Sequence, residues 1–164
     1  MQFFKIILVM ALFATLSACS SKFRTYDGPE VTQVWVYKER RTMYLLHNDE
    51  LLKAYKFDLG FAPEGDKQIE GDGKTPEGRY YIDRRNPNSD FHLSIGISYP
   101  NAQDRLEAMS LLESPGGDIF IHGRGPTVKN PDSDWTWGCI AVTDREIEEI
   151  YAMVKDGTPI NILP

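Results

Sequence analysis

Cysteine and histidine are both scarce in this chain of 164 residues. The two cysteines are Cys19 and Cys139, and the three histidines are His47, His92 and His122. The histidines lie far apart in the sequence, and no His-Glu-x-x-His segment or other close ligand spacing is present. We therefore expect neither a metal site nor a cofactor.

Basic residues are also few, and there is no long apolar run. The chain has 18 Lys and Arg and 24 Asp and Glu, which gives a net charge of −6, and it contains no long run of charges of either sign. Nucleic-acid binding would leave a basic stripe, so we expect no nucleic-acid partner. Ile6 to Leu16 is apolar but falls short of the roughly 20 residues that span a bilayer.

The first residues have the pattern of an export signal. Lys5 gives a short positive region, the apolar run follows, and small residues lead to Leu16-Ser17-Ala18-Cys19. We predict a signal peptide over 1–18. Leu-Ser-Ala-Cys resembles the lipobox of bacterial lipoproteins, which implies that Cys19 is lipidated and becomes the N-terminus. Ser20 then favours the outer membrane of a Gram-negative bacterium, facing the periplasm. An ordinary cleaved signal with a nearby cysteine is the alternative.

Cys139 would then be the only free thiol of an exported protein. The periplasm is oxidising, and an unpaired thiol is a liability there unless it reacts for a purpose. A buried, inert cysteine is the alternative, because cysteine is often buried. The residues around Cys139 favour a chemical role, as described below.

The mature chain reads as a short tether followed by one domain. Residues 19–30 contain Gly28-Pro29 and are polar, which predicts the lipid anchor and a tether. Residues 31–164 are long enough for a single domain. Strands are expected, from their β-branched and aromatic content, at 31–37, 41–46, 51–59, 79–83, 91–99, 118–122 and 159–163.

Helical signals are limited to two places. Thr143 and Glu146 have the spacing of a capping box, and Ile147, Ile150, Tyr151 and Val154 then share one helical face. A second short helix is expected at 103–112. The fold class is therefore mostly β, a sandwich or partly open barrel with one or two short helices.

The carboxyl half of the chain contains a thiol and an imidazole that can act together as nucleophile and base. His122 ends an apolar strand and is followed by Gly123, and Cys139 follows Gly138 after a polar loop. A neutral imidazole can take the proton of a thiol and so produce a nucleophile. The two glycines allow close approach of the backbone, which could orient the histidine and form an oxyanion hole.

These residues, with three further motifs, resemble the L,D-transpeptidase family (the YkuD-like domain). His122-Gly123, a loop, and then Thr136-Trp137-Gly138-Cys139 match its catalytic signature. The segment 65–78, with Lys67 and Gly71-Asp72-Gly73-Lys74-Thr75-Pro76-Glu77-Gly78, matches its upstream loop, and 91–95 and 97–101 match two further blocks. The resemblance extends over 31–164 and implies the fold of that family.

The resemblance also implies roles for individual residues. The Cys139 thiolate would attack a peptidoglycan stem tetrapeptide at its terminal D-alanine, with His122 as general acid and base. The Gly123 carbonyl would orient His122, and the amides of Gly138 and Cys139 would hold the oxyanion. The residues expected to bind substrate are Arg124, Thr136, Trp137 and His92.

One departure from the family pattern leaves the acceptor open. The family commonly has Arg or Asn where this chain has Ala141. The thioester could pass to another stem peptide, to a protein lysine, or to water, as in an L,D-carboxypeptidase or an amidase that releases wall-attached protein. A non-catalytic lipoprotein that binds the wall is a further alternative, which the His122–Cys139 pair disfavours.

Overall fold

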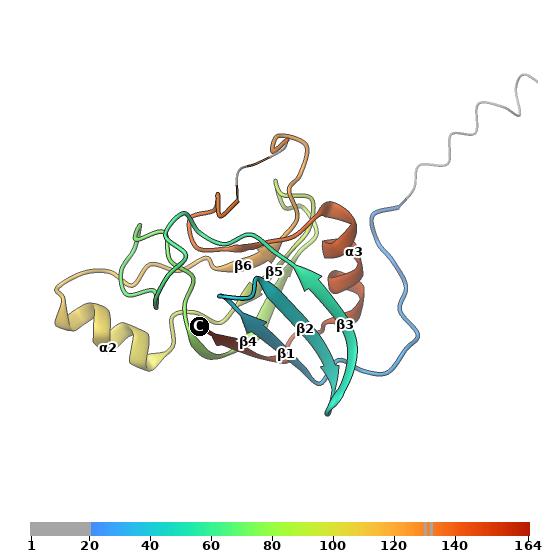
Figure 1. Ribbon diagram of the computed structural model, residues 1–164, viewed down its shortest axis with the longest axis horizontal. Helices are drawn as coiled ribbons and strands as arrows, with labels where there is room; N and C mark the ends of the chain where they lie inside the picture. The colour runs from blue at the N-terminus through green and yellow to red at the C-terminus, as the bar shows by residue number, and fades with distance from the viewer. Residues whose placement is uncertain (1–20, 130, 132) are drawn as a thin grey trace, which may run out of the picture.

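The computed structural model describes residues 21–164 except 130 and 132. The predicted signal peptide and Cys19 lie outside these residues. The described part contains eight strands and two helices (Figure 1). In chain order they are β1 (Gln33–Tyr37), β2 (Thr42–His47), β3 (Glu50–Lys56), β4 (Gly78–Asn86), β5 (Ser94–Ile97), α2 (Ala102–Ser110), β6 (Phe120–His122), β7 (Ile140–Ala141), α3 (Asp144–Met153) and β8 (Pro159–Leu163).

The strands form one sheet whose two edges approach each other. Their order is β3-β2-β1-β8-β4-β5-β6-β7, with β1–β8 and β6–β7 parallel and the other pairs antiparallel. The chain leaving β3 then reaches β7, where Asp58 and Ala141 exchange two backbone hydrogen bonds of 2.8 and 2.9 Å. The sheet is therefore curled into a half-barrel, which confirms the predicted partly open barrel.

Alternating side chains divide the sheet into a core face and an outer face. In β1, Val34 and Val36 are fully buried, whereas Trp35 between them is half-buried on the other face. In β5 both faces are buried, because α3 packs over this part of the sheet and over β6. The core lies between the curled sheet and α3.

Helix α3 begins where its capping box predicts. The amide of Glu146 donates to Thr143 Oγ1 at 3.3 Å, and the amide of Thr143 donates to Glu146 Oε2 at 2.9 Å. Ile147, Ile150 and Met153 are buried on one face of the helix. Helix α2 also begins with a capping box, and it projects from the end of the molecule opposite the N-terminal segment (Figure 1).

The described part of the predicted tether lies against the domain. Residues 21–30 form no helix or strand. Lys22 Nζ nevertheless donates to the backbone oxygen of His92 at 3.0 Å, and Arg24 pairs with Glu148 at 2.7 Å. Phe23 packs near Tyr151, with ring centroids 6.2 Å apart. This segment is therefore docked beside α3 and does not extend freely into solvent.

Neither helix of the described residues combines the length and the apolar composition that a bilayer-spanning segment requires.

The cap of α3 should make a measurable contribution to stability. We expect Thr143→Ala to lower the free energy of unfolding by about 1 kcal/mol, because the amide of Glu146 loses its acceptor. Urea denaturation measures this change. Arg145→Ala, at a side chain that is 81% exposed, is the control and should change stability by less than about 0.5 kcal/mol. Equal losses in the two variants would contradict the assigned cap.

Candidate active site

Strands β6 and β7 bring the thiol and the imidazole to the same face of the sheet. Their parallel register pairs Ile121 with Ile140 and His122 with Ala141. Cys139 precedes β7 and therefore lies beside Phe120, whose amide donates to the Cys139 sulfur at 3.4 Å. Side chains two positions apart share a face of a strand, so His122 and Cys139 point to the same side. Both line one cavity of about 270 Å³.

The tautomer of His122 is set by the residue that follows it. His122 is buried, and its Nδ1 lies 2.6 Å from the Gly123 oxygen. A carbonyl can only accept, so Nδ1 carries the proton and Nε2 is free to act as a base. Gly123 cannot be replaced easily, because a Cβ there would lie 2.6 Å from Asp144 Oδ1 and 2.8 Å from the Phe91 oxygen.

Burial shifts the two pKa values in opposite directions. Burial lowers the pKa of His122, and its hydrogen bond to Gly123 offsets only part of this effect. Burial raises the pKa of Cys139, with the amide of Phe120 acting in the opposite sense. At pH 7 the resting pair is therefore a neutral thiol and a neutral imidazole. In such a pair the imidazole can act as a general base, which takes the thiol proton only when the sulfur reacts.

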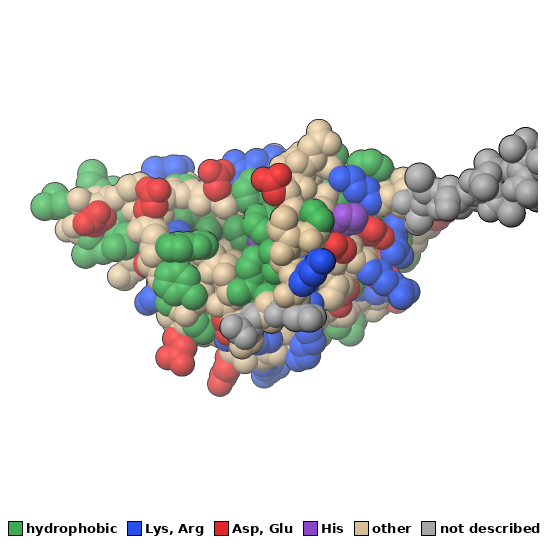
Figure 2. Space-filling view, turned by 90° about the horizontal axis from the view of Figure 1, so that it is seen from above, with side chains coloured by type: hydrophobic (Ala, Val, Ile, Leu, Met, Phe, Trp, Pro, Cys, Tyr) green, Lys and Arg blue, Asp and Glu red, His purple; other side chains and the backbone are tan. Residues whose placement is uncertain are grey.

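A second cavity opens on the other side of Cys139. Its volume is about 460 Å³, and it shares Cys139 and Asp118 with the first cavity. The Cys139 thiol thus lies where two cavities meet. The first is also lined by Asn86, Ser89, Asp90, Phe91, Ser94, Phe120 and His122, and the second by Lys67, Glu70, Gly71, Gly116, Gly117, Ile119 and Trp137. Seen from above, apolar side chains run through the middle of the molecule's face, flanked by ionic ones (Figure 2).

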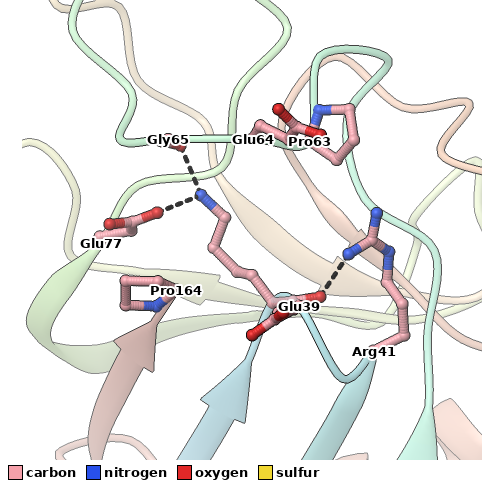
Figure 3. Close-up of a pocket in the computed structure, with 8 residues that line it drawn as sticks. Glu39, Arg41, Pro63, Glu64, Gly65, Glu77 and Pro164 are labelled. Carbon is pink, nitrogen blue, oxygen red and sulfur yellow. Dashed lines mark hydrogen bonds and ion pairs between the residues drawn. The ribbon is translucent and has the colours of Figure 1, made fainter.

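A third cavity, of about 420 Å³, is remote from the thiol. It is lined by neither His122 nor Cys139. The Lys38 ammonium in it is bound by the Gly65 oxygen at 2.5 Å and by Glu77 Oε1 at 2.7 Å (Figure 3). Because this buried cation already has its partners, we assign it to the support of the neighbouring loop and not to ligand binding.

Thr136 has a different place from the one expected. It is buried, and its hydroxyl donates to the Cys139 oxygen at 2.7 Å and accepts from the Gly138 amide at 3.2 Å. It therefore supports the turn that carries Cys139, and its expected role in binding substrate stays a prediction. The Gly138 amide, expected to hold the oxyanion, is already engaged. The Thr-x-Gly spacing could have predicted this local hydrogen bond, since threonine hydroxyls commonly bond nearby backbone.

His92 and Arg124 also lie away from the thiol. The ring of His92 contacts Glu148 on α3 at 2.9 Å and lines neither of the two cavities at Cys139. Arg124 lies 3.6 Å from Asp58 and lines a separate cavity of about 180 Å³ with Ala141. The substrate-binding roles of these two residues therefore stay predictions.

Trp137, which was expected to bind substrate, lines a cavity together with Cys139. Its side chain is 72% exposed and lines the larger cavity beside Cys139. Its ring meets Phe61 edge-on, with centroids 5.0 Å apart. Phe61 thus supports the Trp137 ring, which forms part of the cavity wall.

Two supporting residues were missed from the sequence. Asp144 Oδ1 accepts from the amides of Arg124 and Gly125 at 2.7 and 2.9 Å, which holds the turn after His122. Thr75, in the upstream loop, donates its hydroxyl to the Gly138 oxygen at 2.7 Å. An acidic residue in the first turn of a helix was visible in the sequence, but its partner was not. Within residues 21–164, apart from the two positions left undescribed, no cluster of His, Cys, Asp or Glu could hold a metal ion.

Comparison with known proteins gives a consistent result. Residues 32–162 match the family model of the L,D-transpeptidase catalytic domain, YkuD. YafK of Escherichia coli K12, whose name assigns it provisionally to the L,D-transpeptidases, is 32% identical over 127 residues. That match covers 74% of this chain and 46% of YafK. The chain thus spans about half the length of the curated relatives it matches.

Solved structures share the fold. The helical cell shape determining protein Pgp2 of Campylobacter jejuni is 27% identical, with a TM-score of 0.65, over 84% of this chain and 49% of Pgp2. Bd1075 of Bdellovibrio bacteriovorus gives a TM-score of 0.58 at 24% identity, over 86% of this chain and 50% of that protein. L,D-transpeptidase 1 of Mycobacterium tuberculosis gives a TM-score of 0.53 at 13% identity, over 82% of this chain and 62% of that protein. The last two matches show the fold alone.

The opposite pKa shifts predict how the thiol reacts with pH. We expect the rate of Cys139 alkylation by iodoacetamide to stay low at neutral pH and to rise with a midpoint above the ordinary thiol pKa, because burial disfavours the thiolate. Mass spectrometry of the adduct against time measures the rate. A rate that is high and constant between about pH 5 and pH 8 would instead show a preformed thiolate–imidazolium pair, as in some Cys–His proteases.

Proposed function

The chain belongs to the L,D-transpeptidase (YkuD) family, and from this we propose that it is a cysteine acyltransferase acting on peptidoglycan stem tetrapeptides. The observation that carries the proposal is the position of Cys139. Its thiol stands where two cavities meet, and it shares one of them with a histidine whose base nitrogen is free. This arrangement suits an acyl transfer, since the acyl part of the donor can occupy one cavity while the leaving group departs through the other and the acceptor enters there.

The first half of the reaction forms a thioester. His122 Nε2 takes the Cys139 proton as the sulfur bonds to the carbonyl carbon between the third residue and the terminal D-alanine. The carbonyl oxygen becomes an oxyanion, and collapse of this intermediate breaks the peptide bond. The proton on His122 passes to the nitrogen of the departing D-alanine. The enzyme is left with an acyl group on sulfur and a neutral imidazole.

The second half transfers the acyl group. An amine enters the vacated side, His122 takes its proton, and nitrogen replaces sulfur on the acyl carbon. The thiol then recovers its proton from His122. A stem-peptide amine would give a cross-link, a protein lysine would attach that protein to the wall, and water would give a tripeptide.

The hydrolytic outcome is supported by the residue at position 141. Ala141 stands opposite His122 in the β6–β7 register and offers only a methyl group where the family commonly has Arg or Asn. Its methyl group offers no hydrogen bond and lines the cavity of Arg124 and neither cavity at Cys139, so the side chain that the family commonly has at this position is missing. An L,D-carboxypeptidase, or an amidase that releases wall-attached protein, is therefore the second candidate. Both candidates need the same acyl-enzyme.

The reaction and its branch can be tested together. The purified protein should release D-alanine from disaccharide tetrapeptides, and Cys139→Ala should reduce this rate by at least about 10³-fold because the nucleophile is lost. Mass spectrometry distinguishes the products, since a cross-linked dimer indicates transfer and a tripeptide alone indicates hydrolysis. Equal behaviour of wild type and Cys139→Ala, or binding of wall peptides without turnover, would contradict both candidates and favour a binding protein.

We also propose that the protein is lipid-anchored through Cys19 and faces the periplasm from the outer membrane. The Leu16-Ser17-Ala18-Cys19 sequence supports this assignment. Each methylene group of the acyl chains that is buried in the bilayer contributes about 0.8 kcal/mol to membrane binding, so such an anchor retains the protein at a membrane.

The anchor predicts a difference between the two cysteines. In cells fed an alkyne-tagged fatty acid, wild type and Cys139→Ser should be labelled, whereas Cys19→Ser should not. The Cys139→Ser variant is the matched control, because it removes the other thiol of the chain. Labelling that persists in Cys19→Ser, or is absent from wild type, would contradict the anchor.

A further inference from the structure

A buried hydroxyl of the upstream loop reaches across to the turn that carries the nucleophile. Thr75 is fully buried, and its Oγ1 donates to the Gly138 oxygen at 2.7 Å. The two residues are 63 positions apart in the chain. A buried hydroxyl needs a hydrogen-bond partner, and the partner of this one is the carbonyl that immediately precedes Cys139.

That contact fixes the orientation of one peptide plane. In a trans peptide the carbonyl and the following amide point in opposite directions. Holding the Gly138 oxygen toward Thr75 therefore directs the Cys139 N–H away from the loop. Gly138 has a φ of +125°, a conformation that suits glycine. A glycine there gives the peptide little preference of its own, so an outside contact must select the orientation.

The polar groups on either side of the Cys139 amide already have partners. The Gly138 amide and the Cys139 oxygen are both held by Thr136, and the sulfur receives the Phe120 amide. The Cys139 amide has no acceptor among the residues that the structure describes, and it belongs to the residue that carries the sulfur. A free amide on the nucleophilic residue itself is the donor that an oxyanion formed on that sulfur would meet.

We infer that Thr75 is a positioning residue, which orients the Cys139 amide so that it can stabilise the oxyanion. Thr75 does not touch the reacting atoms and acts through the Gly138 carbonyl. The inference rests on the proposed role of Cys139 as nucleophile. It gives the Thr75-Pro76-Glu77-Gly78 motif a function in the chemistry, beyond its place in the fold.

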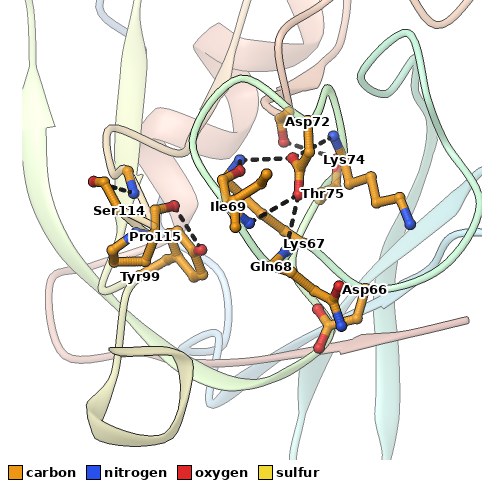
Figure 4. Close-up of polar contacts among 12 residues, drawn as sticks. Asp66, Lys67, Gln68, Ile69, Asp72, Lys74, Thr75, Tyr99, Ser114 and Pro115 are labelled. Atoms are coloured by element: carbon orange, nitrogen blue, oxygen red, sulfur yellow. Dashed lines mark hydrogen bonds and ion pairs between the residues drawn. The ribbon is translucent and has the colours of Figure 1, made fainter. Parts of the chain in front are cut away.

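Ion pairs and hydrogen bonds within the upstream loop, residues 65–78, fix the position of Thr75. Lys67, buried on one side, pairs with Asp72 at 2.8 Å, and Asp72 also accepts from the amides of Gln68 and Lys74 (Figure 4). On the other side, the buried Lys38 donates to the Thr75 backbone oxygen at 3.0 Å. Two buried cations thus fix the loop from both directions, and the Thr75 hydroxyl gains a defined place from which to hold Gly138.

The test compares two reactions of the same thiol. Acylation by p-nitrophenyl acetate passes through a tetrahedral oxyanion before p-nitrophenolate leaves. Alkylation by iodoacetamide displaces iodide at a saturated carbon and forms no oxyanion. We expect Thr75→Val, which keeps the shape of the side chain and removes the hydroxyl, to slow acylation about 10- to 100-fold, somewhat less than the loss of a whole oxyanion donor. Alkylation should change by less than about threefold, and Thr75→Ser should restore most of the acylation rate.

Two controls keep the result interpretable. Thr42→Val also removes a buried hydroxyl that donates to a backbone oxygen, that of Arg40 at 2.9 Å, but Thr42 lines neither cavity at Cys139. It should leave both rates unchanged. If Thr75→Val does not fold, Thr75→Ala removes the same hydroxyl with a smaller side chain. Parallel loss of both reactions in the Thr75 variants, or no loss of acylation, would overturn the inference.

Failure of the underlying proposal would look different. If wild type and Cys139→Ser released p-nitrophenolate at the same rate, the nucleophile itself would be wrong, whatever the Thr75 variants did. The readout does not depend on any peptidoglycan substrate, so the role of Thr75 can be judged separately from the identity of donor and acceptor.

Discussion

The site depends on the contact between the two edges of the curled sheet. After β3 the chain exchanges backbone hydrogen bonds with β7 at Asp58 and Ala141, and Thr136 bonds both to Leu59 and to Phe61, each at 3.0 Å. This short ladder encloses the turn of Cys139 between β6 on one side and residues 57–61 on the other. Without it β7, only two residues long, would pair with β6 alone, and the turn of Cys139 would be held from one side only.

Around that contact, backbone carbonyls and amides contact the side chains of His122 and Cys139 directly. A carbonyl at Gly123 sets the histidine tautomer, and an amide at Phe120 faces the sulfur. The residues that hold these groups, such as Asp144 behind the turn after His122, come from separate parts of the chain. Because such a site is assembled from peptide planes, its glycines are constrained by crowding: a Cβ at Gly138 would approach the Lys74 oxygen to 2.5 Å.

Helix-capping and strand patterns, which involve residues close in sequence, predicted much of the fold. They did not predict contacts between residues that are far apart in the sequence. The capping box at Thr143 and the strand 159–163 were found because their signals lie within a few residues. β7 was missed, because two residues carry no periodicity. His122, Gly123 and Cys139 were assigned from a motif. The substrate-binding roles of His92 and Thr136 stay predictions, and only the tertiary structure shows that one contacts Glu148 and the other the backbone of Cys139.

The raised pKa of the Cys139 thiol has a consequence for the lifetime of the protein. Peroxides and disulfides attack the thiolate, and a thiol that stays protonated reacts with them slowly. In the oxidising compartment that we propose, a lone and permanently ionised cysteine would soon be lost to sulfenic acid or mixed disulfides. Burial that withholds the charge until His122 removes the proton would let this thiol survive between encounters with substrate.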